Sequence, residues 1–235
     1  PIPTPEATPL PESPPYIGWS DPAAVGQPWG SAVEGLLTFR GNPTRTYYGK
    51  GPVPEQPVKQ WSYPQNRNMC SSTTLNNEDE QWCGTGWTGQ PAIFRYRDST
   101  WVVFGALDSA VHFVDAESGQ PILDPYPTED IIKGSVTIDP DGYPLVYIGS
   151  RDDKFRVIAF DREDPKELWS LDANSVPGAA WNNDWDGSPI VIDDYLFEGG
   201  ENSVFHIIKL NRSYDSAGFV TVDPELVFSA PGYDD

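Results

Sequence analysis

The sequence predicts an all-β fold, a β-propeller of four-stranded blades, because the chain repeats itself three times. The copies open at Gly89, Gly134 and Gly187, which are 45 and 53 residues apart. Each copy contains short apolar runs separated by polar turns. A period of about 40–50 residues with several short strands per unit is typical of propeller blades. Aromatic residues make up 13% of the chain and include nine Trp, so there is enough bulk for a core.

Glycine and turn residues recur at matching places in the copies. Each copy opens with Gly because the innermost strands of blades converge on the axis, where a side chain would crowd its neighbours. The second apolar run also ends in Gly, and a polar residue follows three positions later. These residues are Gly105, Gly149 and Gly199, followed by Asp108, Asp152 and Asn202. The third apolar run closes on Asp115, Asp161 and Asn211, where Asp or Asn caps a tight turn before the outer strand.

The number of copies predicts an incomplete propeller. Residues 87–235 supply about three full blades, and a segment near 58–63 resembles the closing strand of a blade. Propellers usually have about 4–8 blades, so the ring needs more strands than these. Either the chain is the N-terminal part of a longer product, or a second chain supplies the remaining blades. A compact four-bladed form with a degenerate first blade is the alternative.

The segment 16–86 is expected to be irregular and packed on the blades. Besides the strand near 58–63, only Gly35–Phe39 has the pattern of a short strand. Residues 64–86 are rich in Asn, Ser, Thr and acidic residues, and this composition predicts a long polar loop.

Residues 1–15 contain seven Pro and predict an extended spacer, because proline fixes φ and removes a backbone donor. Such spacers connect a cleaved signal, a lipid anchor or a membrane helix to a folded domain. The chain starts at Pro1 without an initiator Met, and no run approaches the ~18 apolar residues of a membrane span. We therefore expect an exported protein, periplasmic or extracellular, and a membrane tether is one of the options that the spacer leaves open. A polyproline segment that binds a partner is the alternative.

Cys70 and Cys83 are the two cysteines of the chain. In an exported protein they predict a disulfide that closes a loop of about 14 residues, worth roughly 3 kcal/mol on the chain-entropy model. Two cysteines are too few for a zinc site by themselves. Two free thiols in a reducing compartment are the alternative.

The net charge is −20, from 35 acidic and 15 basic side chains. Such a balance is a poor match to nucleic acid or to an anionic membrane surface. The sequence also lacks HExxH, GxSxG and Walker motifs and a Cys–His constellation. It therefore offers no catalytic residues for a hydrolase and no phosphate-binding loop for a nucleotide-dependent enzyme.

One stretch has the spacing of a calcium loop. Oxygen-bearing side chains at alternate positions can converge on one hard cation, and a glycine at the sixth position permits the sharp turn. The candidate ligands are Asn182, Asp184, Asp186 and Asp193. The same residues open the third copy, and Gly187–Ile192 is expected to be a strand that points away from such a loop. Solvated turn carboxylates are therefore the alternative reading.

His112 and His206 each lie seven residues past a repeat glycine, and Arg156 holds that place in the middle copy. Equivalent positions on different blades are rotated apart around the axis. We therefore expect no shared metal site, and half-exposed strand positions for both histidines.

The segment from Ala159 to Trp169 resembles the repeat of quinoprotein-type, PQQ-like β-propellers. That repeat has Ala two residues before an Asp, here Asp161, and Trp eight residues after it. The first copy has Leu123 in place of the Trp, and Phe228 takes this place in the third copy. In such a repeat the Trp packs between adjacent blades.

Such propellers divide into dehydrogenases and non-catalytic scaffolds. In the enzymes, the resemblance implies a quinone cofactor between a Trp and a disulfide of adjacent cysteines, with Ca²⁺ and a catalytic Asp. This chain has no adjacent Cys pair, so we expect no catalytic residues and no cofactor other than calcium. A part of a PQQ-dependent quinoprotein oxidoreductase, with its cofactor residues outside this chain, is the alternative.

We therefore expect a non-catalytic exported scaffold that mediates protein–protein interaction in an envelope or membrane-associated assembly. Large amphipathic rings on loops give much contact energy for each side chain that is ordered. The predicted anchors are Trp82, Trp87, Trp181 and Trp185.

Overall fold

The computed structural model describes residues 22–30, 32–75, 78–86 and 89–233. Within these ranges the chain forms antiparallel sheets joined by turns, with two short 3-10 helices, η1 (Pro22–Ala24) and η2 (Ala173–Ser175). The all-β prediction is confirmed. The proline-rich spacer expected over 1–15 lies outside the described residues. No helix in the described ranges is long and apolar enough to span a membrane.

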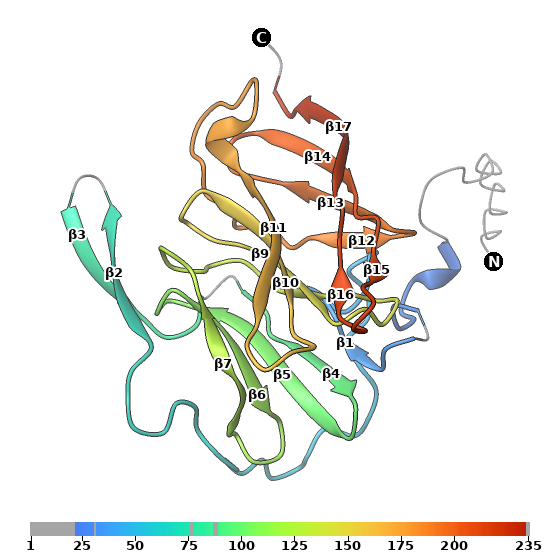
Figure 1. Ribbon diagram of the computed structural model, residues 1–235. Coiled ribbons are helices and arrows are strands. Elements are labelled where there is room, and N and C mark those ends of the chain that lie inside the picture. The colour runs from blue at the N-terminus through green and yellow to red at the C-terminus, as the bar shows by residue number, and fades with distance from the viewer. Residues whose placement is uncertain (1–21, 31, 76–77, 87–88, 234–235) are drawn as a thin grey trace, which may run out of the picture.

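Each copy of the repeat folds into one antiparallel sheet (Figure 1). The first sheet contains β4 (Ala92–Tyr96), β5 (Ser99–Ala106), β6 (Ala110–Asp115) and β7 (Pro121–Pro127). The second contains β8 (Thr137–Ile138), β9 (Leu145–Gly149), β10 (Lys154–Ala159) and β11 (Lys166–Asp172). The third contains β12 (Ile190–Ile192), β13 (Tyr195–Gly199), β14 (Val204–Lys209) and β17 (Glu225–Pro231). The four-stranded blades predicted from the repeat are therefore present.

The three copies converge at their opening glycines. A Cβ on Gly89 would lie 2.7 Å from the carbonyl oxygen of Gly134, and a Cβ on Gly134 would lie 2.7 Å from that of Gly187. Because real Cβ atoms do not approach so closely, only glycine fits at these places. The sheets thus follow one another around a common centre, as blades do.

An N-terminal strand joins the first sheet, but it is not the predicted one. β1 (Gly35–Leu36) pairs with β4, within the segment that had a strand pattern. Residues 58–63 form no strand. Instead the Trp61 indole donates a hydrogen bond of 2.9 Å to the Ala116 carbonyl, and its ring lies against Gly119. The alternating, aromatic-rich pattern there reflects a side chain packed on the β6–β7 turn.

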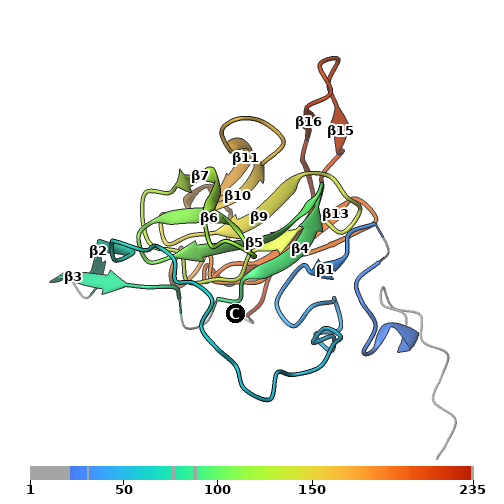
Figure 2. The same ribbon diagram turned by 90° about the horizontal axis from the view of Figure 1, so that it is seen from below.

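Two-stranded ribbons project from the sheets (Figure 2). The predicted polar loop at 64–86 contains one of them, β2 (Cys70–Leu75) paired with β3 (Glu78–Cys83), so that prediction was wrong in this part. The other, β15 (Ser213–Tyr214) with β16 (Val220–Thr221), separates the third and outer strands of the third sheet.

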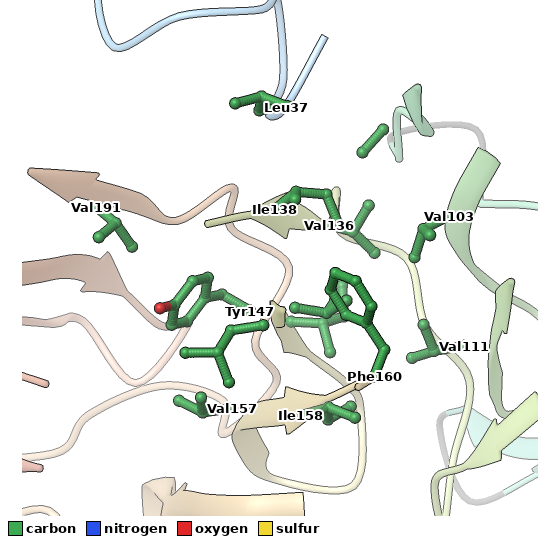
Figure 3. Packing of buried hydrophobic residues seen from close by; sticks show 14 of the residues in the cluster. Leu37, Val103, Val111, Val136, Ile138, Tyr147, Val157, Ile158, Phe160 and Val191 are labelled. Atoms are coloured by element: carbon green, nitrogen blue, oxygen red, sulfur yellow. The ribbon is translucent and has the colours of Figure 1, made fainter. Parts of the chain in front are cut away.

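One hydrophobic core joins the three sheets and the N-terminal segment. The ring of Phe160, which follows β10, lies 5.1–5.9 Å from the rings of Phe94, Tyr96 and Trp101 on the first sheet. Figure 3 shows Leu37 from the N-terminal segment, Val103 and Val111 from the first sheet, Tyr147 and Val157 from the second and Val191 from the third. All six are buried, so the sheets are parts of one folded unit.

The recurring polar residues pair across the turn between the second and third strands. Asp108 Oδ1 lies 2.9 Å from His112 Nε2, and Asp152 Oδ2 lies 2.6 Å from Arg156 Nη2. In the third sheet His206 takes this place beside Ser229. His112 and His206 are both fully buried, so the expectation of half-exposed positions was wrong. They lie on different sheets.

Candidate interaction surface

A row of four directly paired residues crosses each sheet, and in the first two sheets it lies on the face turned towards the next sheet. The rows are Ala92, Val103, Phe113 and Leu123; then Thr137, Tyr147, Val157 and Trp169; then Ile190, Phe197, Ile207 and Phe228. The equivalence of Leu123, Trp169 and Phe228, predicted from the repeat, is confirmed by their strand register.

The third row is more exposed than the first two at equivalent positions. On the second strands, Val103 and Tyr147 are fully buried and Phe197 is half-buried. On the outer strands, Leu123 and Trp169 are half-buried and Phe228 is 49% exposed. The residue two places earlier on the third strand follows the same trend: Phe155 is 0% exposed and Phe205 is 41% exposed. We call Phe205, Ile207 and Phe228 the open face.

The difference follows from what covers each sheet. A Cβ on Gly105 would meet Ile132, and a Cβ on Gly149 would meet Trp185. Each of these residues lies two positions before the glycine that opens the next copy. At the equivalent Gly199, the nearest described atom to such a Cβ is 3.9 Å away, in Phe205 of the same sheet. The opening segment of a following sheet covers the first two sheets, and no described residue takes that place on the third.

The outer edge of the third sheet is also apolar. β17 pairs with β14 on one side and ends the sheet on the other. Leu226 and Val227 on this strand are 49% and 45% exposed. An outer strand with adjacent exposed apolar side chains is a typical contact surface for another protein segment.

The predicted tryptophan anchors have different surroundings. Trp185 is fully buried between Phe155 and His206 and donates a hydrogen bond to the Asp153 carbonyl, so it cannot be an exposed anchor. Trp181 is 91% exposed. Trp82 is half-buried and donates to Glu80 at 3.0 Å. Trp87 lies outside the described residues.

The calcium-loop residues come together only in part. Ligand atoms of Asp184, Asp186 and Glu201 lie within 4.8 Å of one another, and Asn182 donates to Glu201 at 2.7 Å. Asp193 lies beyond β12, in the turn before β13, so the strand that was expected to lead away from the loop does so. The predicted set of four is therefore not assembled at one place.

The basic side chains of Lys133 and Arg151 form ion pairs with this acidic group. Lys133 Nζ lies 2.6 Å from Asp186 and 3.2 Å from Asp184, and Arg151 Nε lies 3.1 Å from Asp184. Burial raises the pKa of both aspartates, and Lys133 opposes that rise. The arrangement is a salt-bridge network between the second and third copies. Calcium binding there stays a prediction.

The predicted disulfide is present. Cys70 and Cys83 are directly opposite in the β2–β3 ladder, with Cα atoms 4.1 Å apart, and their sulfurs are bonded. The bridge closes the base of a ribbon and not of an irregular loop.

A buried acid that the sequence analysis missed lies near the centre. Glu198 on β13 is 5% exposed and its side chain forms no hydrogen bond with the described residues. Burial raises its pKa to about 8, and the positive charge of Arg45 opposes the rise. Arg45 is held by the Phe39 carbonyl and the Ser188 carbonyl. The sequence did contain an indication of this buried acid, because Glu198 is the single acidic residue in the otherwise apolar run of β13.

A depression of about 430 Å³ lies beside β1, at the opposite end of the molecule's series of sheets. Its walls include Leu36, Tyr47, Tyr48 and Ile93. Tyr48 is 67% exposed and the Arg40 guanidinium lies 5.5 Å from its ring. The first sheet thus also has an apolar area without a covering sheet in the described ranges.

Comparison with known proteins gives a weak structural similarity. No family model matches the chain, and no curated protein matches it. Among solved structures, BamB from Moraxella catarrhalis is similar with a TM-score of 0.39 and 16% sequence identity. The match covers 68% of this chain and 58% of the BamB chain, so this chain spans less than two thirds of that structure. A similarity at this level assigns neither a family nor a function.

Proposed function

We propose that the chain is a non-catalytic, exported β-propeller scaffold that mediates protein–protein interaction in an envelope or membrane-associated assembly. The open face of the third sheet is the proposed docking surface. Its proposed occupant is a further four-stranded sheet that continues the series. The main observation is that the opening segment of the next copy covers each of the first two sheets, whereas no described segment covers the third, where Phe205 and Phe228 are exposed.

The shape of the open face supports this occupant. Gly199 leaves space at the place where Gly105 and Gly149 receive the opening segment of the next copy. An incoming sheet with an equivalent opening segment would fill that space and cover Phe205 and Phe228. Phe205 and Phe228 are 41% and 49% exposed, so burying the rest of each ring is worth about half of the ~1.5–3 kcal/mol of a whole side chain. Together they would form the centre of an interface.

The disulfide supports export. Disulfides persist in oxidising compartments and are rare in the cytosol, where thiols are kept reduced. The Cys70–Cys83 bridge is placed on a ribbon that projects from the molecule, where a reducing environment would reach it.

Site-specific photo-cross-linking tests the proposal. A photoreactive phenylalanine analogue replaces Phe228 in the producing cell, and the control places it at Phe219, which is 40% exposed but lies in the β15–β16 ribbon. The expected result is a cross-linked product from position 228, and the peptide attached to it should come from a β-strand of the proposed further sheet. Equal yields at positions 228 and 219 would contradict the proposal.

A second variant tests the fit of the docking surface. Gly199→Val fills the free space beside β13 and is expected to remove the cross-link at position 228 without unfolding the chain. A cross-link that persists at full yield in this variant would show that the occupant does not dock as a blade.

A further inference from the structure

The β2–β3 ribbon has a defined pattern of inward and outward backbone groups. Gly84 N donates to Met69 O at 2.7 Å, so residues 69 and 84 form a hydrogen-bonded pair next to the Cys70–Cys83 pair. Hydrogen-bonded and non-hydrogen-bonded pairs alternate along an antiparallel ladder. Asp79 and Gln81, opposite Thr74 and Ser72, are therefore in non-hydrogen-bonded pairs. Their N–H and C=O groups point away from β2.

The two edges of the ribbon differ. On the β2 edge, Arg151 donates to the Thr74 carbonyl at 2.8 Å and to Thr73 Oγ1 at 2.7 Å. Ser71 Oγ donates to the Leu107 carbonyl at 2.9 Å. These bonds turn the β2 edge towards the sheets. Figures 1 and 2 show β3 on the outer side of the ribbon.

The β3 edge is free within the described part of the chain. No backbone group of Asp79 or Gln81 bonds to a described residue, and residues 78–81 are all exposed. The edge is also held in place, because the disulfide closes its base and Arg151 fastens the neighbouring strand. A strand edge fixed in this way needs little ordering when a partner binds.

The side chains of β3 indicate the charge of the partner. Glu78, Asp79 and Glu80 are adjacent, and none of them forms an ion pair with a described cation. Thr74 donates to Asp79 and Trp82 donates to Glu80, which fixes two of these carboxylates without neutralising them. Cross-strand pairs of opposite charge stabilise neighbouring strands, so a cationic segment fits here.

We propose that the β3 edge binds an extended, basic segment of a partner protein as a third strand of the ribbon. The backbone groups of Asp79 and Gln81 would form the ladder, and Lys or Arg side chains of the segment would lie beside the acidic residues. Strand addition of this kind takes affinity from backbone hydrogen bonds and selectivity from side chains on alternate positions. This surface is separate from the open face, and the inference does not depend on it.

A defined peptide tests the inference with the whole 235-residue chain. The probe is a nine-residue peptide of alternating Lys and Val, labelled for fluorescence anisotropy, and its counterpart alternates Glu and Val. The Lys peptide is expected to bind and the Glu peptide is not. Two further peptides carry N-methyl groups on either the Lys or the Val amides, and one of them is expected to bind at least tenfold more weakly, because only one peptide edge faces β3. Equal binding of both methylated peptides would reduce the contact to charge attraction and overturn the proposal.

A matched pair of proline variants places the site on β3. Gln81→Pro removes an outward N–H of β3 and is expected to weaken binding at least tenfold. Ser72→Pro removes the outward N–H directly opposite, on β2, and is expected to bind like the unchanged chain. Equal affinities of the two variants, or no binding of the Lys peptide at millimolar concentration, would overturn the proposal. The methylated peptides keep the test decisive if a proline distorts the ribbon.

Discussion

The backbone of Trp185 lies so close to Gly149 that no Cβ fits on the glycine. Such a Cβ would be 2.5 Å from the Trp185 carbonyl oxygen. Gly105 has the same relationship to Ile132, where a Cβ would be 2.8 Å from the isoleucine Cβ. The recurring glycine at the end of each second strand is therefore explained by the opening segment of the following copy.

Gly149→Ala is expected to destabilise the protein by about 1–3 kcal/mol, because the methyl group overpacks a close contact between the second and third sheets. The matched control is Gly199→Ala, where the space is free and the change is expected to be neutral or slightly stabilising. Urea denaturation followed by tryptophan fluorescence measures both. Equal losses in free energy of unfolding would contradict the proposed role of this glycine.

The repeat carried the successful part of the prediction. Glycines at sheet openings and the register of Leu123, Trp169 and Phe228 follow from the spacing of the repeat and from the steric needs of converging strands. The disulfide was predicted separately, from the two cysteines of a chain expected to be exported. A single sequence shows such constraints because the same residue types recur at matching positions in each copy.

The failures concern surroundings that the local sequence does not contain. Trp61 lies in an alternating segment, but its partner is a carbonyl 55 residues away on the first sheet. Trp185 was expected on a loop surface, yet the following sheet and Phe155 bury it. The β2–β3 ribbon has a polar composition because most of it faces solvent, so the sequence shows no apolar alternation from which its two strands could be predicted.

The Asp152–Arg156 pair supplies a second prediction. Both side chains are almost completely buried, at 3% and 4% exposed. Burial acts to raise the pKa of Asp152, but hydrogen bonds from Arg156 and Ser150 bring it below its ordinary value. Arg156→Met leaves the carboxylate without its cation, and a loss of about 3–5 kcal/mol is expected.

The control for this prediction is the neighbouring Lys154–Glu129 pair, whose side chains are 33% and 76% exposed. Lys154→Met is expected to cost less than about 1 kcal/mol, because exposed ion pairs contribute little. Thermal and urea denaturation of the two variants should therefore rank them clearly. A larger loss for Lys154→Met would refute the assignment of the buried pair.

Glu198 predicts a specific dependence of stability on pH. Burial raises the pKa of its carboxyl group to about 8 in the folded protein, from an ordinary value of 4.5. The folded state therefore keeps a proton that the unfolded state releases between these values. The free energy of unfolding should fall as pH rises from about 4.5 to about 8, by up to about 1.4 kcal/mol per pH unit from this group.

Glu198→Gln removes this titration while keeping the size of the side chain. The variant is expected to match the unchanged protein near pH 4.5 and to be increasingly more stable up to pH 8. Urea denaturation at several pH values measures the difference. A difference that stays constant across this range would show that Glu198 ionises normally in the folded state.

The disulfide supplies the last prediction, and its effect should be local. The bridge closes a ribbon that is fastened to the sheets by few contacts, chiefly those of Arg151 and Ser71. In the double variant Cys70→Ser, Cys83→Ser the open ribbon gains chain entropy, worth roughly 3 kcal/mol for a loop of this length. Hydrogen exchange should therefore become faster in β2 and β3, while the amides of β9 and β10 keep their protection. If β9 and β10 lost protection as strongly as the ribbon, the bridge would stabilise the whole fold, and the prediction of a local effect would be wrong.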